Sequence, residues 1–107
     1  TAPASGYQAR ARQRGLTLRA MNDADFATSE RIYASTRAEE LARSGWPAAA
    51  RASFLRQQHA AQHAHYRRHY PGADWWMIER AQVPIGRLFV MEGAREIRLI
   101  DIALLPE

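Results

Sequence analysis

The four histidines of the chain lie close together, and histidine is the side chain best suited to bind a transition metal or to move a proton near neutral pH. His59 and His63 are four residues apart, and so are His65 and His69. On a helix, this spacing places both imidazoles of a pair on one face, as in many zinc sites. The two pairs point to nearly opposite sides, however, and neither has an obvious third ligand. We therefore expect no metal site.

Two residue types are missing, and their absence excludes several chemistries. The chain has no cysteine, so it can form neither a disulfide nor a thiolate metal site, and it has no cysteine nucleophile. All 15 basic residues are arginine, which excludes a lysine Schiff base. The length of 107 residues and the hydrophobic content of 47% are typical of one globular domain.

The net charge of +4 comes mainly from the start of the chain. Residues 1–14 contain three arginines and no acid, and they lack a helical or strand period of apolar residues, so we expect a flexible basic tail there. The remaining body, residues 15–107, is nearly neutral, which makes nucleic acid an unlikely partner. The chain shows neither a signal peptide pattern nor an apolar run of the roughly 18 residues that a membrane-spanning helix needs. We therefore expect a cytoplasmic protein without a membrane partner.

Local signals in the first two thirds of the body predict a strand and two long helices. Alternation of apolar and polar residues over 16–20 is typical of a half-buried strand. Asn22 can cap a helix that begins near residue 23, and Gly45 can end it. Pro47 fits the first turn of a second helix, which we expect over residues 47–70.

After Pro71-Gly72, the period changes to short apolar runs over 75–78, 85–91 and 97–105, separated by turn residues at 82–84 and 93–94. These runs predict an antiparallel meander. The whole order is then strand, helix, helix, strand, strand, strand, which is an α+β fold with two helices over one antiparallel sheet.

The last predicted strand is apolar on both faces. One face would carry Arg98, Ile100, Ile102 and Leu104, and the other Leu99, Asp101, Ala103 and Leu105. Such a strand at the end of a chain leaves one edge unpaired and one face bare, which folded monomers usually avoid. We therefore expect that the chain is cut short. Either a C-terminal half or a partner chain would cover this strand, and self-association across its edge is a further expectation.

Three stretches carry a resemblance to a known family. They are 35–41 with the following Gly45-Trp46, the helical run Phe54-Leu55 with Gln58, Gln62, His65 and Tyr66, and the segment 97–106 that runs apolar into a proline. Together with the order of elements, they resemble the N-terminal half of the GNAT superfamily of acetyl-CoA-dependent N-acetyltransferases, which has an acyl-CoA N-acyltransferase fold. The match covers roughly residues 16–107. The family's glycine-rich pyrophosphate loop, which would follow the last strand, is not in this sequence.

The resemblance implies that acetyl-CoA is the co-substrate and that its pantetheine arm pairs with the backbone of the last strand. By position, this role falls to Ile102, Ala103 and Leu104. Their side chains are otherwise ordinary residues of a core strand. Without the phosphate-binding amides of the missing loop, tight binding of the coenzyme is not expected.

In the family, a substrate amine attacks the thioester directly, so the protein supplies a base rather than a nucleophile. Asp101 is the only acid within the last strand and is our candidate for that base. The alternative is a structural carboxylate that pairs with Arg98 or with Arg87 across the meander.

The resemblance also implies that the two helices and the loop between them form one wall of the site for the acceptor amine. Polar and aromatic groups in that region are Glu39, Glu40, Trp46, Gln58, Gln62 and Tyr66, and His65 beside Tyr66 is a further candidate. The alternatives are that Glu40 pairs with Arg43 or Arg37, that Trp46 plugs the junction of the helices, and that Gln58 and Gln62 form a solvated stripe.

The resulting expectation is an incomplete and inactive portion of an N-acetyltransferase that acts on a small-molecule or peptide amine. The alternative is a non-catalytic interaction module on a degenerate acetyltransferase scaffold, which binds a partner through its unpaired strand.

Overall fold

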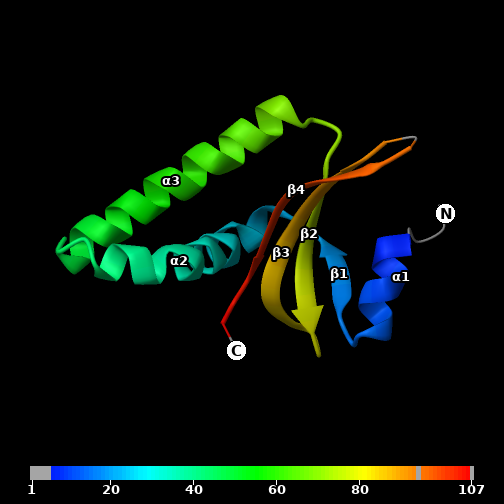
Figure 1. The fold of residues 1–107 in the computed structure, drawn as a ribbon, viewed down its shortest axis with the longest axis horizontal. Helices are drawn as coiled ribbons and strands as arrows, with labels where there is room; N and C mark the ends of the chain where they lie inside the picture. Colours follow the sequence, from blue (N-terminus) through cyan, green and yellow to red (C-terminus); the bar gives the residue numbers. More distant parts are fainter. Residues whose placement is uncertain (1–5, 94, 107) are drawn as a thin grey trace.

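The computed structural model describes residues 6–93 and 95–106. The elements, in chain order, are α1 (Gly6–Gln13), β1 (Thr17–Ala20), a short 3-10 turn η1 (Asp23–Asp25), α2 (Phe26–Ala42), α3 (Ala48–His69), β2 (Asp74–Arg80), β3 (Val83–Glu92) and β4 (Ile97–Leu104). The expected α+β class, with two long helices beside one antiparallel sheet, is therefore confirmed (Figure 1).

Local capping chemistry sets the bounds of the long helices. The Asn22 side chain accepts a hydrogen bond from the Ala24 amide, and the Asp25 carboxylate accepts one from the Asn22 amide, so the turn that leads into α2 has a capping box. Gly45 follows α2 with a φ of 77°, a left-handed conformation that glycine adopts at low cost. Pro47 precedes α3 directly. Among the described residues, none of the helices has the length and apolar content needed to cross a bilayer.

The four strands are antiparallel neighbours in the order β1-β2-β3-β4. The turn between β2 and β3 consists of Ala81 and Gln82, which both have positive φ values, of 51° and 68°. Our prediction placed this turn at residues 82–84, which is too far along the chain, because Val83 and Pro84 already belong to β3. Pro84 is tolerated there because it lies at an irregularity in the β2–β3 pairing, where a missing amide costs little.

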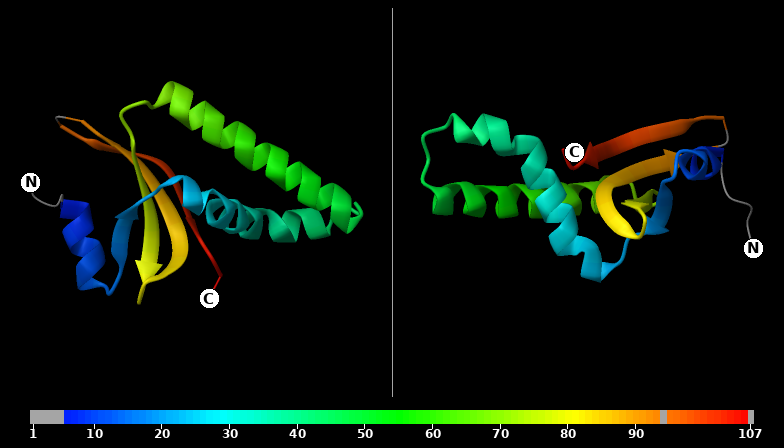
Figure 2. Two further views of the ribbon diagram at one scale, coloured as in Figure 1. Left: turned by 180° about the vertical axis from the view of Figure 1, so that it is seen from behind. Right: turned by 90° about the horizontal axis from the view of Figure 1, so that it is seen from below.

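Both long helices lie on the same side of the sheet and form a hairpin that projects away from it (Figures 1 and 2). The sheet-proximal part of this hairpin contributes Ile32 of α2 to a hydrophobic cluster with Met77 of β2 and Ala103 of β4, and Leu41 is buried near the distal end of α2. The distal half extends beyond the sheet and therefore leaves side chains of both helices without cover from the strands.

Helix α1 corrects our expectation that residues 1–14 lack regular structure. Its Tyr7 packs edge-on against Trp76, and the Trp76 indole N–H donates a hydrogen bond of 3.0 Å to the Tyr7 hydroxyl. Successive strand residues point to opposite faces, and Trp75 contacts α3 through His63 and Tyr66. Trp76, and with it α1, therefore lies on the other face of the sheet. Residues 1–5 of the predicted tail lie outside the described residues.

Strand β4 contains a bulge that changes which side chains share a face. Phe89 pairs with Asp101, but the next residue, Val90, pairs with Leu99, so Ile100 is the extra residue. Leu99 therefore lies on the same face as Ile102, not on the opposite face as strict alternation predicted. This face of β4, which we call the open face, exposes about half of each of four apolar side chains: Ile97, Leu99, Ile102 and Leu104.

Candidate functional site

A buried arginine, Arg87, lies where both helices meet the sheet. It belongs to β3, between Ile85 and Phe89 on the face that the helices cover, and its exposed fraction is only 2%. Its guanidinium donates hydrogen bonds to three side chains from three different elements. The acceptors are Asp101 Oδ2 on β4 (2.6 Å), Gln62 Oε1 on α3 (2.6 Å) and Ser29 Oγ on α2 (3.0 Å).

Two aromatic rings lie against the Arg87 guanidinium. Its central carbon lies 5.2 Å from the centre of the Phe89 ring and 5.6 Å from that of Tyr33. Cation–π contacts of this kind are strongest where water is excluded. They offset part of the cost of removing the charge from water, and the ion pair with Asp101 offsets a further part.

Ser29 and His59 form the deepest part of this cluster, with exposed fractions of 0% and 1%. Ser29 Oγ already accepts a hydrogen bond from Arg87, so its own proton is available for His59 Nε2, 2.9 Å away. Burial, followed by the positive charge of Arg87, lowers the pKa of His59 to about 4, so the ring is neutral at physiological pH. Within the described part of the chain, His59 Nδ1 and Arg87 Nε have no hydrogen-bond partner.

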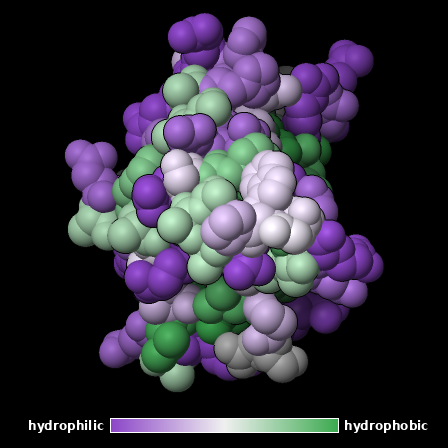
Figure 3. Space-filling model, turned by 90° about the vertical axis from the view of Figure 1, so that its left-hand side faces the viewer, coloured by the Kyte–Doolittle hydropathy of each residue, from purple (hydrophilic) through white to green (hydrophobic). Residues whose placement is uncertain are grey.

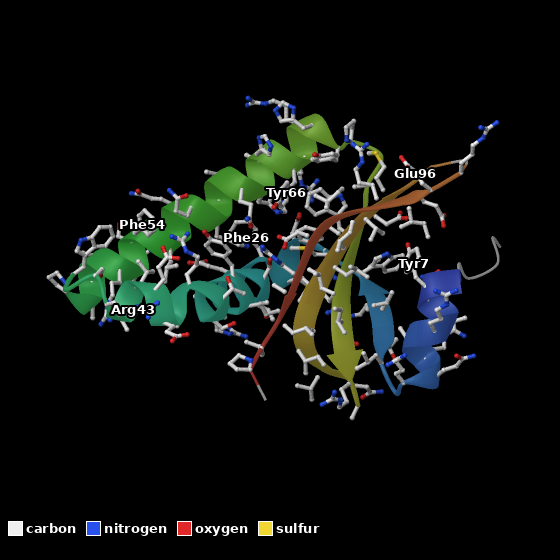
Figure 4. All side chains as sticks on the ribbon, viewed as in Figure 1. Tyr7, Phe26, Arg43, Phe54, Tyr66 and Glu96 are labelled. Carbon is white, nitrogen blue, oxygen red and sulfur yellow. The ribbon has the colours of Figure 1, made fainter. Side chains whose placement is uncertain are left out.

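Tyr66 of α3, which is labelled in Figure 4, lies close enough to this cluster for the charges of Asp101 and Arg87 to act on it. Its ring packs against Trp75 and Phe89, at centroid distances of 6.3 and 6.0 Å. Burial, and next the negative charge of Asp101, raises the pKa of Tyr66. The phenol therefore stays protonated at neutral pH and can donate a hydrogen bond or a proton.

The structure thus brings together three of the residues selected from the sequence: Asp101, Gln62 and Tyr66. The other four helical and loop candidates, Glu39, Glu40, Trp46 and Gln58, do not take part in these contacts. Glu40 forms an ion pair with Arg37 at 2.7 Å, which is one of the alternatives foreseen for it. Trp46 stands edge-on against Phe54 near the distal end of the hairpin and remains 45% exposed. Glu39 and Gln58 are exposed.

The histidine pairs take part in packing. His63 lies against Phe26 and Trp75 and accepts a hydrogen bond from Arg67. His65 and His69 contact each other on the exposed side of α3, with ring centres 4.3 Å apart. Across residues 6–93 and 95–106, no group of three or more histidine or acidic side chains is arranged to hold a metal ion.

Sequence reasoning assigned no site role to Arg87, Ser29 or His59 as a connected group. One signal was present: Arg87 is the only charged residue inside an otherwise apolar strand segment, from Ile85 to Val90. A charge in such a place requires buried polar partners. The pairing with Asp101 on β4 was predicted as one alternative for that carboxylate and is confirmed, whereas only the tertiary fold shows that the other two partners come from the two helices.

The outer edge of β4 is the other chemically useful feature. Because β4 is the terminal strand of the described sheet, its outward backbone groups have no strand neighbour. Ile102, Ala103 and Leu104 lie along this edge, directly after Asp101. The arrangement therefore places one carboxylate, oriented by a buried arginine, beside a strand that can still accept a further extended chain.

Comparisons with known proteins found no match: no family model, no curated protein and no solved structure is similar to this chain.

Proposed function

We propose that this chain is the acceptor-side portion of an N-acetyltransferase of the GNAT type, with acetyl-CoA as its co-substrate. The supporting observation is the combination of a strand-helix-helix-strand-strand-strand order, after α1, with a bulged terminal strand whose outer edge pairs with no strand of the described residues. The acceptor would be a small-molecule or peptide amine.

The proposed reaction joins a substrate nitrogen to an acetyl carbon and breaks a carbon–sulfur bond, so one proton must leave the amine and one must reach the sulfur. In this proposal the backbone of Ile102, Ala103 and Leu104 holds the pantetheine arm as an added strand. Asp101 accepts the amine proton, directly or through water. Arg87 acts as a positioning residue, because its hydrogen bond fixes the Asp101 carboxylate next to that edge.

The acceptor wall of this proposal is wider than the cluster around Arg87. Gln62 and Tyr66 border the cluster itself, whereas Glu39, Glu40, Trp46 and Gln58 would contact only a substrate that reaches along the hairpin. The open face of β4 would be covered by further polypeptide, either from a C-terminal half or from a partner chain, since its four apolar side chains are half exposed.

The test is an NMR titration of the isotope-labelled chain with acetyl-CoA. We expect the amide signals of residues 100–104 to shift, with a dissociation constant of ~1 mM or weaker, because the phosphates gain no loop amides here. Adenosine diphosphate, which lacks the pantetheine arm, serves as the control ligand and should leave β4 unchanged. If acetyl-CoA moves no β4 amide up to about 10 mM, or moves only the same signals as adenosine diphosphate, the proposal is wrong.

The open face favours one second candidate, a non-catalytic interaction module. Four half-exposed apolar residues on an edge strand are typical of a surface that another polypeptide covers. This candidate predicts no response of β4 to acetyl-CoA, so the same titration separates the two functions.

A further inference from the structure

The hairpin contains a groove between α2 and α3 that none of the preceding roles uses. It consists of two adjoining cavities, of about 460 and 310 Å³, which share Arg31, Ala34 and Leu55 as lining residues. Alanine and leucine side chains line it together with three arginines and one glutamate. Figure 3, which views the molecule from the tip of the hairpin, shows apolar and hydrophilic surface side by side at this end. The groove therefore has an apolar floor and a polar rim.

Small side chains make this floor accessible to a bulky partner. Ala27, Ala34 and Ala38 line it from α2, and Ala52 lines it from α3 beside Leu55. Short side chains allow another helix to approach to about 8 Å between axes. From Ala27 to Leu41, the groove follows α2 for about 21 Å, which is the length of a helix of about 14 residues.

The charges on the rim are mainly positive. Arg31, Arg51 and Arg56 line the groove together with one acid, Glu30. Among the residues described, none of these arginines forms an ion pair, and Arg31 donates only to the Thr28 hydroxyl. Helix α3 contains no acidic residue in its 22 positions. The complementary occupant is therefore acidic, which argues against α1 of a second copy, because α1 is itself basic.

We propose that this groove binds an acidic amphipathic helix of a partner protein. The apolar stripe of that helix lies on the alanines and Leu55, and its flanking carboxylates pair with the three arginines. The arginines lie on both helices and in both cavities, so they match charges spread along a helix better than the single head group of a fatty acid. The inference is independent of the proposed acetyltransferase activity.

A synthetic helix tests this inference with the chain as it stands. The probe is a peptide of about 15 residues with leucines spaced three and four apart and glutamates on both flanks. Isothermal titration should give a dissociation constant on the order of 10 μM at low salt, weakening several-fold at high salt. A peptide with lysine in place of every glutamate should bind at least about tenfold more weakly, because it meets like charges.

Matched variants on α3 locate the site. Ala52→Glu adds a carboxylate inside the groove and should weaken binding at least about tenfold, whereas Ala60→Glu makes the same change at an exposed position that does not line it. Arg51→Gln with Arg56→Gln removes rim charge without adding bulk and should also weaken binding. Equal affinity for the glutamate and lysine peptides, or equal loss in both alanine variants, would overturn the proposal. So would binding of dodecanoate in the groove without binding of the peptide.

Discussion

Arg87 is the residue on which the junction between helices and sheet depends most. A buried guanidinium is expensive to desolvate, and here α2, α3 and β4 each supply one acceptor for it. Removing the arginine leaves a largely buried carboxylate, a buried hydroxyl and an amide without their donor. Removing both charges avoids that penalty. The two kinds of change should therefore have very different consequences.

We expect Arg87→Met to lower the free energy of unfolding by ~3 to 5 kcal/mol, because Asp101 loses its buried counter-charge. The double variant Arg87→Met with Asp101→Leu should recover a large part of this loss. Urea denaturation followed by circular dichroism measures both values. Arg68→Met on the exposed side of α3 is the control and should change stability by no more than about 0.5 kcal/mol. A loss for Arg87→Met as small as that of the control would show that the cluster does not hold the junction together.

His59 makes stability depend on pH. Because burial lowers its pKa to about 4, from 6.5 in an exposed histidine, the unfolded state binds the proton more tightly than the folded state. The stabilising effect of the neutral ring is complete above pH 6.5 and is lost as the pH falls to about 4, by a total of ~3 kcal/mol.

The pH dependence can be assigned to His59 by difference. In His59→Gln, the decline in unfolding free energy between pH 6.5 and 4 should be clearly shallower than in the wild type, whereas the exposed His69→Gln variant should follow the wild type. Some slope should remain in His59→Gln, because burial also lowers the pKa of His63. Parallel curves for wild type and His59→Gln would contradict the assignment.

At the scale of the elements, the contact between β3 and β4 depends on one glycine. A Cβ atom on Gly86 would lie 2.5 Å from both the Ala103 carbonyl oxygen and Leu104 Cδ2. The carbonyl belongs to the paired strand and has little freedom to move. We therefore expect Gly86→Ala to lower the free energy of unfolding by ~1 to 3 kcal/mol or more.

Gly72→Ala is the matched control for this change. A Cβ there would meet only Met91 Cε, at an ordinary contact distance of 3.7 Å, so the substitution should be close to neutral. Thermal unfolding of both variants compares them directly. If Gly86→Ala melts at the same temperature as Gly72→Ala, β4 does not pack as closely on β3 as described.

The elements that sequence predicted well are those with local signals. Asn22 marks the start of the first long helix through its capping side chain, Gly45 marks its end through a left-handed backbone conformation, and apolar alternation marks the strands. The bulge at Ile100 has no comparable signal, because it depends on how two strands align. Helix α1 was also missed, since its apolar contact rests largely on Tyr7 and on a tryptophan 69 residues away.

The candidate site likewise contains some residues that the sequence predicted and others that only the fold reveals. Gln62, Tyr66 and Asp101 were selected from the sequence, and the fold brings them to one place. Glu40 has the right chemistry, but a neighbour one helical turn away already pairs with it. The pairing of Arg87 with Asp101 was one of the alternatives predicted for that carboxylate and is confirmed, whereas the contact of Arg87 with Ser29 joins distant segments that no local pattern connects.

At the scale of the whole molecule, the described chain is elongated. Its principal extents are 48, 31 and 24 Å, and its radius of gyration is 15.1 Å, compared with about 13 Å for a compact domain of this length. The projecting hairpin accounts for the long axis (Figure 1). The molecule therefore presents two apolar surfaces, the groove in the hairpin and the open face of β4.

The open face leads to a prediction about association. An edge strand with a row of half-exposed apolar side chains is a template for pairing with another chain, and in a pure sample the available partner is a second copy. In sedimentation experiments, we expect the average mass to rise above 12.1 kDa as the concentration increases. Leu99→Lys with Ile102→Lys places two charges on this face and should keep the chain monomeric. Val83→Lys is the control, because Val83 is 59% exposed but lies at the β2–β3 turn, outside the residues of β3 that pair with β4. If association persists in the β4 double variant, or if Val83→Lys abolishes it, the contact between copies lies elsewhere. If the wild type stays monomeric at ~1 mM, the open face does not mediate self-association.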